Sequence, residues 1–260
     1  MKTLVFSGSG ALYPTHLGAA AAYYEVKGQP DRLLGISGGA LVASVLSSGG
    51  EPELYLEFLL NTLPKNVIGI NWLWPFRRHW GAGSLNTLEK ALRTKAPRLF
   101  ADCKIDLNIV CTDLDNNVPR VYSSSNTPKE QVPNIACASA SIPGIFAPRE
   151  DMEGNLLVDG GLCGTLWVDA FSDGDVTGIL LKGRSIKPKK VTTLLDFVES
   201  TIGTTLLHVD NEHMEDAFWA NIITVDVDWN GLEFTKMDEE VVKRMYKKGY
   251  DTVKAKLKSQ

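Results

Sequence analysis

The chain has 260 residues, of which 44% are hydrophobic and 22% charged, and its formal net charge is -4 at pH 7. This composition is typical of a globular protein, and the negative charge without any long basic run argues against nucleic-acid binding. The sequence contains no apolar stretch of about 18 residues, and its first apolar run breaks at Ser7-Gly8, so we expect a cytoplasmic protein without a signal peptide or a transmembrane helix.

The first fifty residues alternate between strand and helix signals. Lys2 to Phe6 is predicted as a buried strand, and a glycine-rich turn over residues 7–11 leads to a helix from Thr15 to Lys27. A second strand, Arg32 to Ile36, is followed by a helix from Gly38 to about Ser48. This β-α-β-α order requires parallel strands joined by right-handed crossovers and therefore predicts an α/β fold.

The remainder of the chain continues the mixed pattern. Helices are predicted over residues 53–61, 85–95, 130–141 and 194–201, with a final long helix capped by Asp238, and strands over residues 105–111, 118–123, 155–159, 176–181 and 222–228. No repeat, low-complexity segment or linker rich in proline and serine divides the chain. We therefore expect a single domain over residues 1–260.

A serine flanked by glycines lies where the second strand meets its helix. Gly35-Ile36-Ser37-Gly38-Gly39 has the Gly-x-Ser-x-Gly pattern of a nucleophile elbow between a strand and a helix. Glycines tolerate the strained angles and close packing of such a turn. The turn would present the Ser37 hydroxyl and direct the Gly38 amide at the group under attack. The pattern alone does not distinguish this elbow from a glycine-rich turn with an idle serine.

The turn Gly8-Ser9-Gly10 follows the first strand. It does not fit the dinucleotide-binding fingerprint, because the third glycine of Gly-x-Gly-x-x-Gly would fall on Tyr13. Backbone amides in such a turn, at the start of a helix, favour an anion. Since neighbouring parallel strands end at the same edge of a sheet, we expect this turn to face Ser37 and to supply donors for an oxyanion.

Ser37 needs a base to become nucleophilic, and the sequence leaves two candidates open. An α/β-hydrolase triad would use His208 or His213, although few residues then precede the elbow. Alternatively, Asp159 ends a predicted strand and precedes Gly160-Gly161. Burial would raise the pKa of this carboxyl from about 4 and make it a better base. A simple turn aspartate before glycine is the structural alternative.

Taken together, these segments resemble the patatin-like phospholipase family. The matching pieces, in the family's order, are the turn Gly8-Ser9-Gly10-Ala11 followed by His16 and Gly18, the elbow around Ser37, residues 138–143 with Phe146 beyond them, and Asp159-Gly160-Gly161. The C-terminal pattern from Leu232 to Tyr250 also looks like the family's end. The resemblance therefore covers nearly the whole chain.

This resemblance implies a three-layer α/β/α fold with a mainly parallel central sheet. It also implies hydrolysis of acyl ester bonds in membrane lipids or other acyl esters, with Ser37 as nucleophile and Asp159 as base, and with no histidine, metal ion or other cofactor. The amides of residues 8–10 and Gly38 would form the oxyanion hole. The reaction would pass through an acyl-enzyme that a water molecule hydrolyses.

The first turn departs from the family's usual Gly-Gly-Gly-x-Arg/Lys-Gly. Ser9 stands at the second glycine, Leu12 at the basic residue and Tyr13 at the last glycine. A backbone donor needs no particular side chain, but the change removes a positive charge near the oxyanion. It leaves open a weak enzyme, or a lipid-binding module without activity on the same scaffold.

One tryptophan-rich segment suggests contact with a membrane surface. Trp72, Trp74 and Trp80 lie close to Arg77 and Arg78. Tryptophan and arginine favour the interface between lipid and water, so these tryptophans are candidate membrane-contact residues. Aromatic side chains packed under a loop are the alternative.

Cysteine and histidine spacing gives no metal-binding motif. No Cys-x-x-Cys pair is present, and no histidine lies at ligand spacing from the cysteines, which are Cys103, Cys111, Cys137 and Cys163. We expect buried, reduced thiols. We also expect His16, on the first helix, to pack or hydrogen-bond locally.

Overall fold

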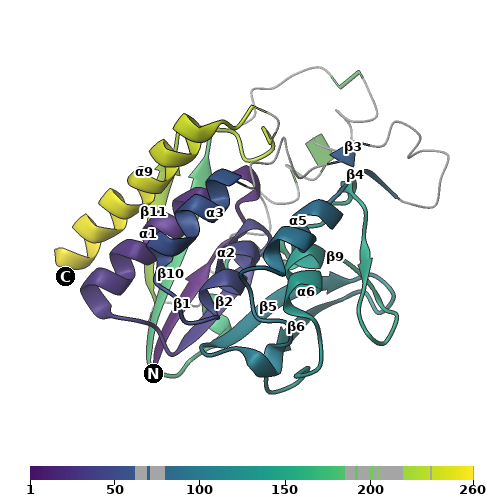
Figure 1. The fold of residues 1–260 in the computed structure, drawn as a ribbon, viewed down its shortest axis with the longest axis horizontal. Helices are drawn as coiled ribbons and strands as arrows, with labels where there is room; N and C mark the ends of the chain where they lie inside the picture. The colour runs from purple at the N-terminus through teal and green to yellow at the C-terminus, as the bar shows by residue number, and fades with distance from the viewer. Residues whose placement is uncertain are drawn as a thin grey trace.

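A computed structural model describes residues 1–61, 69–70, 80–184, 191–192, 200–201, 204, 219–234 and 236–259. Within them, the main sheet has the strand order β11-β10-β1-β2-β5-β9-β8, with β6 also paired to β5. These strands are β1 (Lys2–Phe6), β2 (Arg32–Ile36), β5 (Asp106–Asp113), β6 (Val118–Ser123), β8 (Arg149–Glu150), β9 (Leu156–Asp159), β10 (Asp175–Gly183) and β11 (Asn221–Val227). Figure 1 shows how they lie in the fold.

The prediction of a mainly parallel α/β sheet is confirmed. Strands β11, β10, β1, β2 and β5 are neighbours and run parallel, whereas β6, β9 and β8 are antiparallel to their partners. A separate small sheet of β3 (Gly69–Ile70), β4 (Gly81–Ser84) and β7 (Gly144–Phe146) was not predicted. Its strands are short and rich in glycine, which removes the alternation of side chains that marks a strand in a sequence.

Most predicted helices are present with bounds shifted by a few residues. The α-helices are α1 (Tyr13–Lys27), α2 (Gly38–Leu46), α3 (Leu56–Asn61), α5 (Asn86–Leu92), α6 (Val132–Ser139) and α9 (Glu239–Lys258). Short 3-10 helices are η1 (Gly10–Leu12), η2 (Pro52–Tyr55), η4 (Phe100–Asp102), η5 (Gly160–Cys163) and η6 (Val168–Ala170). Asp238 caps α9 as expected, since its Oδ1 accepts a hydrogen bond from the Val241 amide. Most of the predicted helix 194–201 lies outside the described residues.

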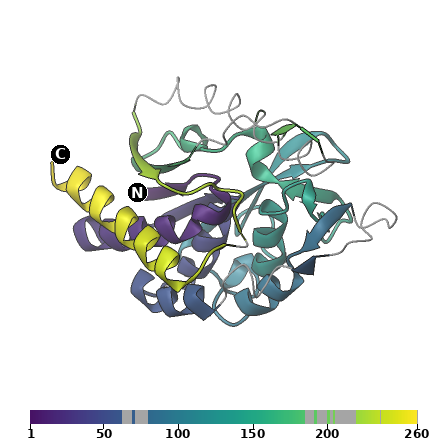
Figure 2. The ribbon, with the colours of Figure 1, turned by 90° about the horizontal axis from the view of Figure 1, so that it is seen from above.

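The two faces of the sheet carry cores of different size. Successive side chains of a strand point to opposite faces, so Leu4 and Phe6 join the larger core under the helices, whereas Val5 joins a smaller core with Leu166 and Val168. Figure 2 shows α1, α2 and α9 on the same side of the sheet. No helix within the described ranges is long and apolar enough to span a bilayer.

Helices α1 and α9 cross with their backbones in contact. A Cβ atom placed on Gly249 would lie 2.0 Å from the carbonyl oxygen of Thr15, and one on Gly18 would lie 1.9 Å from that of Tyr246. Both helices therefore need glycine at the crossing. Because α1 starts directly after η1, this contact also fixes the end of the glycine-rich turn.

We predict that Gly249→Ala destabilises the protein. In an open helix this change stabilises by about 1 kcal/mol, but here the methyl group collides with the Thr15 carbonyl, and overpacking of this kind costs about 1–3 kcal/mol. Urea unfolding measures the difference. Lys256→Ala, at an exposed position of the same helix, is the control and changes the free energy of unfolding by less than about 0.5 kcal/mol. A Gly249→Ala protein more stable than the wild type would contradict the close backbone contact between α1 and α9 at Gly249.

Candidate active site

The Gly-x-Ser-x-Gly segment forms a tight elbow between β2 and α2. Ser37 has φ 53° and ψ -123°, a backbone conformation that non-glycine residues adopt only under strain. A Cβ atom on Gly35 would lie 2.6 Å from the Ala40 Cα, and one on Gly39 would lie 2.6 Å from the Ser7 carbonyl oxygen. Both flanking positions therefore accept only glycine, and the serine is held at the N-terminus of α2.

Strand β5 brings the elbow and Asp159 together. Its Val110 pairs with Ile36, the last residue of β2, and its next residue, Cys111, pairs with Asp159, the last residue of β9. Strand β6 pairs with residues 108–113 of β5, which include partners of both β2 and β9, so β6 lies along the opposite edge of β5. Strands β2 and β9 therefore approach each other end to end along one edge of β5.

The Ser37 hydroxyl donates a hydrogen bond of 2.6 Å to Oδ2 of Asp159. Both residues are only 5% exposed. Oδ1 of Asp159 accepts from the Gly161 amide at 2.8 Å, and Gly160 lies against the Val110 carbonyl. Burial raises the pKa of Asp159 to about 6, against the opposing effect of the hydrogen bonds from Ser37 and Gly161. At neutral pH the carboxylate is mostly ionised and accepts the hydrogen bond from the Ser37 hydroxyl.

The end of α6 positions both groups. Ser139 Oγ accepts from the Ser37 amide at 2.9 Å and donates to the Val110 carbonyl at 2.6 Å, while the Asp159 amide donates to the Ser141 carbonyl at 3.0 Å. Sequence reasoning gave these two serines no role. The run of small residues from 138 to 141 could have signalled that a backbone approaches closely at this point.

The glycine-rich turn is fixed by contacts with distant segments. The Gly8 amide donates to the Thr165 carbonyl, and the Ala11 amide donates to the Gly231 carbonyl, each at 2.7 Å. His16 Nε2 donates to the Ser7 carbonyl at 2.9 Å. Burial lowers the pKa of His16 to about 3, so this ring is neutral and has the local structural contact that was expected.

Two of the predicted oxyanion donors lie beside Ser37. The amides of Gly10 and Gly38 have no acceptor among the described residues, and both glycines line a cavity together with Ser37. Ser9 has a negative φ of -151° and an equally free amide, but it is not part of the cavity lining. The Gly8 amide is occupied by Thr165. The geometry therefore favours Gly10 and Gly38 as the oxyanion hole.

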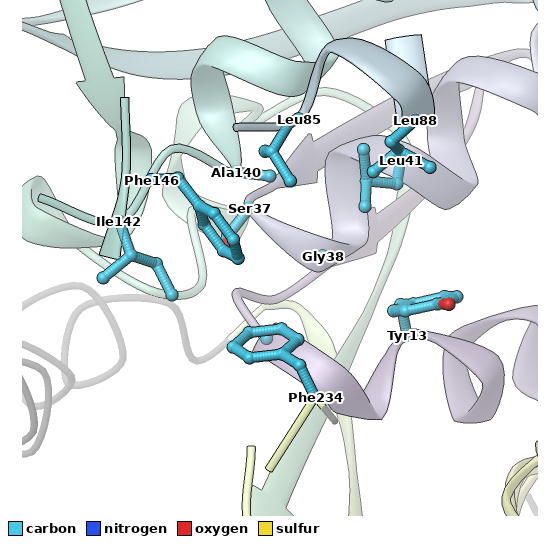
Figure 3. A pocket seen from close by; sticks show the side chains of 11 residues that line it. Tyr13, Ser37, Gly38, Leu41, Leu85, Leu88, Ala140, Ile142, Phe146 and Phe234 are labelled. Atoms are coloured by element: carbon cyan, nitrogen blue, oxygen red, sulfur yellow. The ribbon is translucent and has the colours of Figure 1, made fainter. Parts of the chain in front are cut away.

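Ser37 lines an apolar cavity that is partly open to solvent. Figure 3 shows the side chains that surround it, and its lining consists of Gly10, Tyr13, Ser37, Gly38, Leu41, Leu85, Leu88, Ala140, Ile142, Phe146 and Phe234. Phe234 packs edge to face against Phe146, with ring centroids 5.5 Å apart. An apolar wall around a single nucleophile suits a hydrocarbon chain better than a sugar or a peptide.

Residues 4–172 match the patatin-like phospholipase family. The chain belongs to this family. The matched region contains Ser37 and Asp159. It ends before Gly231, whose carbonyl holds the glycine-rich turn, and before Phe234, which lines the cavity. No pattern in the sequence indicated these two contacts, because they depend on how the segment after β11 packs against η1 and β7.

Several known proteins are similar to this chain in sequence or in fold. A patatin-like phospholipase domain-containing protein of Chaetomium globosum is 29% identical over 159 residues, which cover 56% of this chain and 18% of that protein. The uncharacterized protein YqhO of Bacillus subtilis is 27% identical over 257 residues, covering 86% of this chain and 87% of that protein. The crystal structure of VipD from Legionella pneumophila has the same fold, with a TM-score of 0.61, 15% identity and coverage of 99% of this chain and 67% of that chain.

The remaining candidate residues of this patatin-like chain are only partly described. Trp80 is 57% exposed and directly precedes β4, whereas Trp72, Trp74, His208 and His213 lie outside the described residues. Membrane contact by the tryptophans stays a prediction. No disulfide joins the four cysteines, all of which lie within the described residues. Cys111 and Cys137 are buried as expected, whereas Cys103 and Cys163 are half-buried. Across the described ranges, no group of three or more Cys, His, Asp or Glu side chains is arranged to hold a metal ion.

We predict that Asp159→Asn stabilises the folded protein at alkaline pH. Folding raises the pKa of this carboxyl to about 6, so its contribution to stability is full below the unfolded pKa of about 4 and is lost as pH rises through 6. Neutral asparagine avoids that loss, which is worth about 3 kcal/mol at pH 8 and close to nothing at pH 4. Urea unfolding at both pH values tests this.

The exposed Glu57→Gln change serves as the control and shifts the free energy of unfolding by less than about 0.5 kcal/mol at either pH. If Asp159→Asn lowered the free energy of unfolding by the same amount at pH 8 as at pH 4, the cost of burying an ionised carboxylate would not dominate the contribution of Asp159 to stability.

Proposed function

We propose that this protein is a lipid acyl hydrolase of the phospholipase A type, which cleaves carboxylic ester bonds with Ser37 and Asp159. The observation that carries the proposal is the 2.6 Å hydrogen bond to Asp159 from the hydroxyl of Ser37, which lines an apolar cavity. Membership of the patatin-like phospholipase family supports a lipid hydrolase in general.

In the proposed reaction, Ser37 Oγ attacks the ester carbonyl carbon and its proton passes to Oδ2 of Asp159. The carbonyl oxygen becomes an oxyanion that accepts hydrogen bonds from the Gly10 and Gly38 amides, with the N-terminus of α2 behind it. The protonated Asp159 then gives its proton to the departing alcohol oxygen, which leaves an acyl-enzyme. A water molecule, deprotonated by Asp159, attacks the acyl carbon, and Ser37 recovers its proton as the fatty acid leaves.

The environment of Asp159 suits both roles in this cycle. A base that accepts and later returns a proton works best when its pKa lies near the working pH. Burial has moved the pKa of Asp159 to about 6, within reach of neutral pH. The Gly161 amide holds the second carboxylate oxygen, so the side chain stays aimed at Ser37.

We predict that Ser37→Ala and Asp159→Asn each lower ester hydrolysis by about 10³-fold or more, because the first removes the nucleophile and the second removes its base. The measurement is release of p-nitrophenol from an acyl ester, together with fatty-acid release from phospholipid vesicles. Circular dichroism verifies that the variants fold. Ser125→Ala, at an exposed loop position, is the matched control and keeps the wild-type rate.

The competing functions give different results in the same assay. A lipid-binding module without activity shows no turnover that depends on Ser37. A histidine triad loses its rate in His208→Ala or His213→Ala and retains it in Asp159→Asn. Either outcome rejects the proposal.

A second prediction concerns pH. Only the ionised carboxylate of Asp159 can accept the Ser37 proton, so kcat/KM should rise tenfold per pH unit below about 6 and level off above it. Initial rates with one soluble ester between pH 4.5 and 8.5, at pH values where circular dichroism shows the native fold, give this profile. A rate that does not change between pH 5 and pH 7 would contradict the role of Asp159 as base.

A further inference from the structure

We infer that the acyl chain of the substrate lies along Leu41 and Leu88 and ends at Tyr13, which thereby sets the preferred chain length. This inference rests on the proposed hydrolase function. It assigns the two ends of the cavity to the two halves of the ester, which neither the family match nor the fold does.

The cavity extends to both sides of the elbow. Figure 3 shows Tyr13, Leu41 and Leu88 on one side of Ser37 and Gly38, and Ile142 and Phe146 on the other. We call the first set the α1–α2 arm and the second set, with Phe234, the α6–β7 arm. An ester bound at Ser37 has two substituents on its carbonyl group, the acyl chain and the alcohol, and each must enter one arm.

The position of Asp159 decides which arm takes the alcohol. In the proposed cycle Asp159 protonates the alcohol oxygen, so that oxygen must lie within hydrogen-bond reach of the carboxyl group. The Asp159 amide is bonded to the Ser141 carbonyl, and the Ser37 amide to Ser139 Oγ. Asp159 therefore lies beside the C-terminal end of α6 and next to Ser141, the residue that precedes Ile142 in the chain. The alcohol, including any lipid head group, must leave through the α6–β7 arm.

The acyl chain must then take the opposite direction. With the oxyanion at the Gly10 and Gly38 amides and the alcohol towards Asp159, the remaining substituent of the tetrahedral carbon passes over Gly38 along α2. Leu41 lies three residues after Gly38, on the same face of that helix. Leu41 and Leu88 present only aliphatic atoms to this arm. Each methylene group that they bury favours binding about fourfold.

Tyr13 forms the far wall of the α1–α2 arm. It is the first residue of α1, is only 7% exposed and belongs to the main core, so its ring has little room to move. Burial raises the pKa of its hydroxyl group, which therefore stays neutral. A chain long enough to reach this ring must stop or displace a core residue. Tyr13 is thus a specificity-determining residue for acyl length.

The test compares two series of esters. The first keeps p-nitrophenol and varies the acyl group from butanoate to hexadecanoate, and the second keeps one acyl group and varies the alcohol. Tyr13→Ala should raise kcat/KM for the longest acyl group relative to butanoate by about tenfold, because the opened space buries further methylene groups. Tyr13→Phe, which keeps the ring, should retain the wild-type optimum length. Ile142→Ala should change the ranking of alcohols and keep the optimum acyl length.

The outcomes separate this inference from the function on which it rests. If hydrolysis depends on Ser37 but Tyr13→Ala leaves the acyl ranking unchanged, or if Ile142→Ala shifts the optimum length, the assignment of the arms is overturned and the hydrolase stands. If the wild-type protein shows no turnover that depends on Ser37, the hydrolase itself fails. Should Tyr13→Ala not fold by circular dichroism, Tyr13→Leu makes the same comparison with a smaller change in volume.

Discussion

The site depends on one strand, β5, serving as the shared partner of β2 and β9. Ser37 and Asp159 are separated by more than a hundred residues in the chain, yet they meet because their strands end opposite the adjacent residues Val110 and Cys111. A strand advances about 3.3 Å per residue, and a slip of one residue also turns every side chain to the other face. Any change of register in β9 would therefore remove the carboxylate from the serine.

A second aspartate fixes that register. Asp151 lies in the turn between β8 and β9, where its Oδ1 accepts from the amides of Glu153 and Asn155, and its Oδ2 accepts from the Tyr122 hydroxyl of β6 at 2.8 Å. The turn is thereby tied to the strand on the other edge of β5. Asp151 and Asp159 are both buried, but only in Asp159 does burial outweigh the hydrogen bonds and raise the pKa. In Asp151 burial is outweighed by hydrogen bonds, led by those from Asn155, and its pKa is lowered. The Asp151 carboxylate therefore has a structural role, whereas the raised pKa of Asp159 suits a group that accepts and returns a proton.

The sequence predicted those parts of the site that depend on local backbone geometry. The elbow at Ser37 and the parallel pair β1 and β2 follow from glycines and apolar runs that lie next to each other in the chain, and their bounds agree with the structure. The partnership of Ser37 with Asp159 needed the family resemblance, because a strand that ends in Asp-Gly-Gly has no local signal of its register. The contacts of Ser139, Gly231 and Phe234 were missed for the same reason. Each is set by tertiary packing between elements far apart in the chain.

The unusual start of α1 is consistent with a site that handles an apolar chain. Leu12, which stands where the family pattern carries a basic residue, is 2% exposed and belongs to the main core. A charge buried at this point would lose its hydration at a cost of several kcal/mol. Without it, stabilisation of the oxyanion in the proposed reaction falls to the Gly10 and Gly38 amides and to the N-terminus of α2, where one good donor is worth about 3–4 kcal/mol. The same change leaves Leu12 and Tyr13 as consecutive buried side chains, the second of which faces the cavity. In this turn, therefore, no positive charge stabilises the oxyanion. Instead, Tyr13 adds an apolar wall that would contact the acyl chain bound to Ser37.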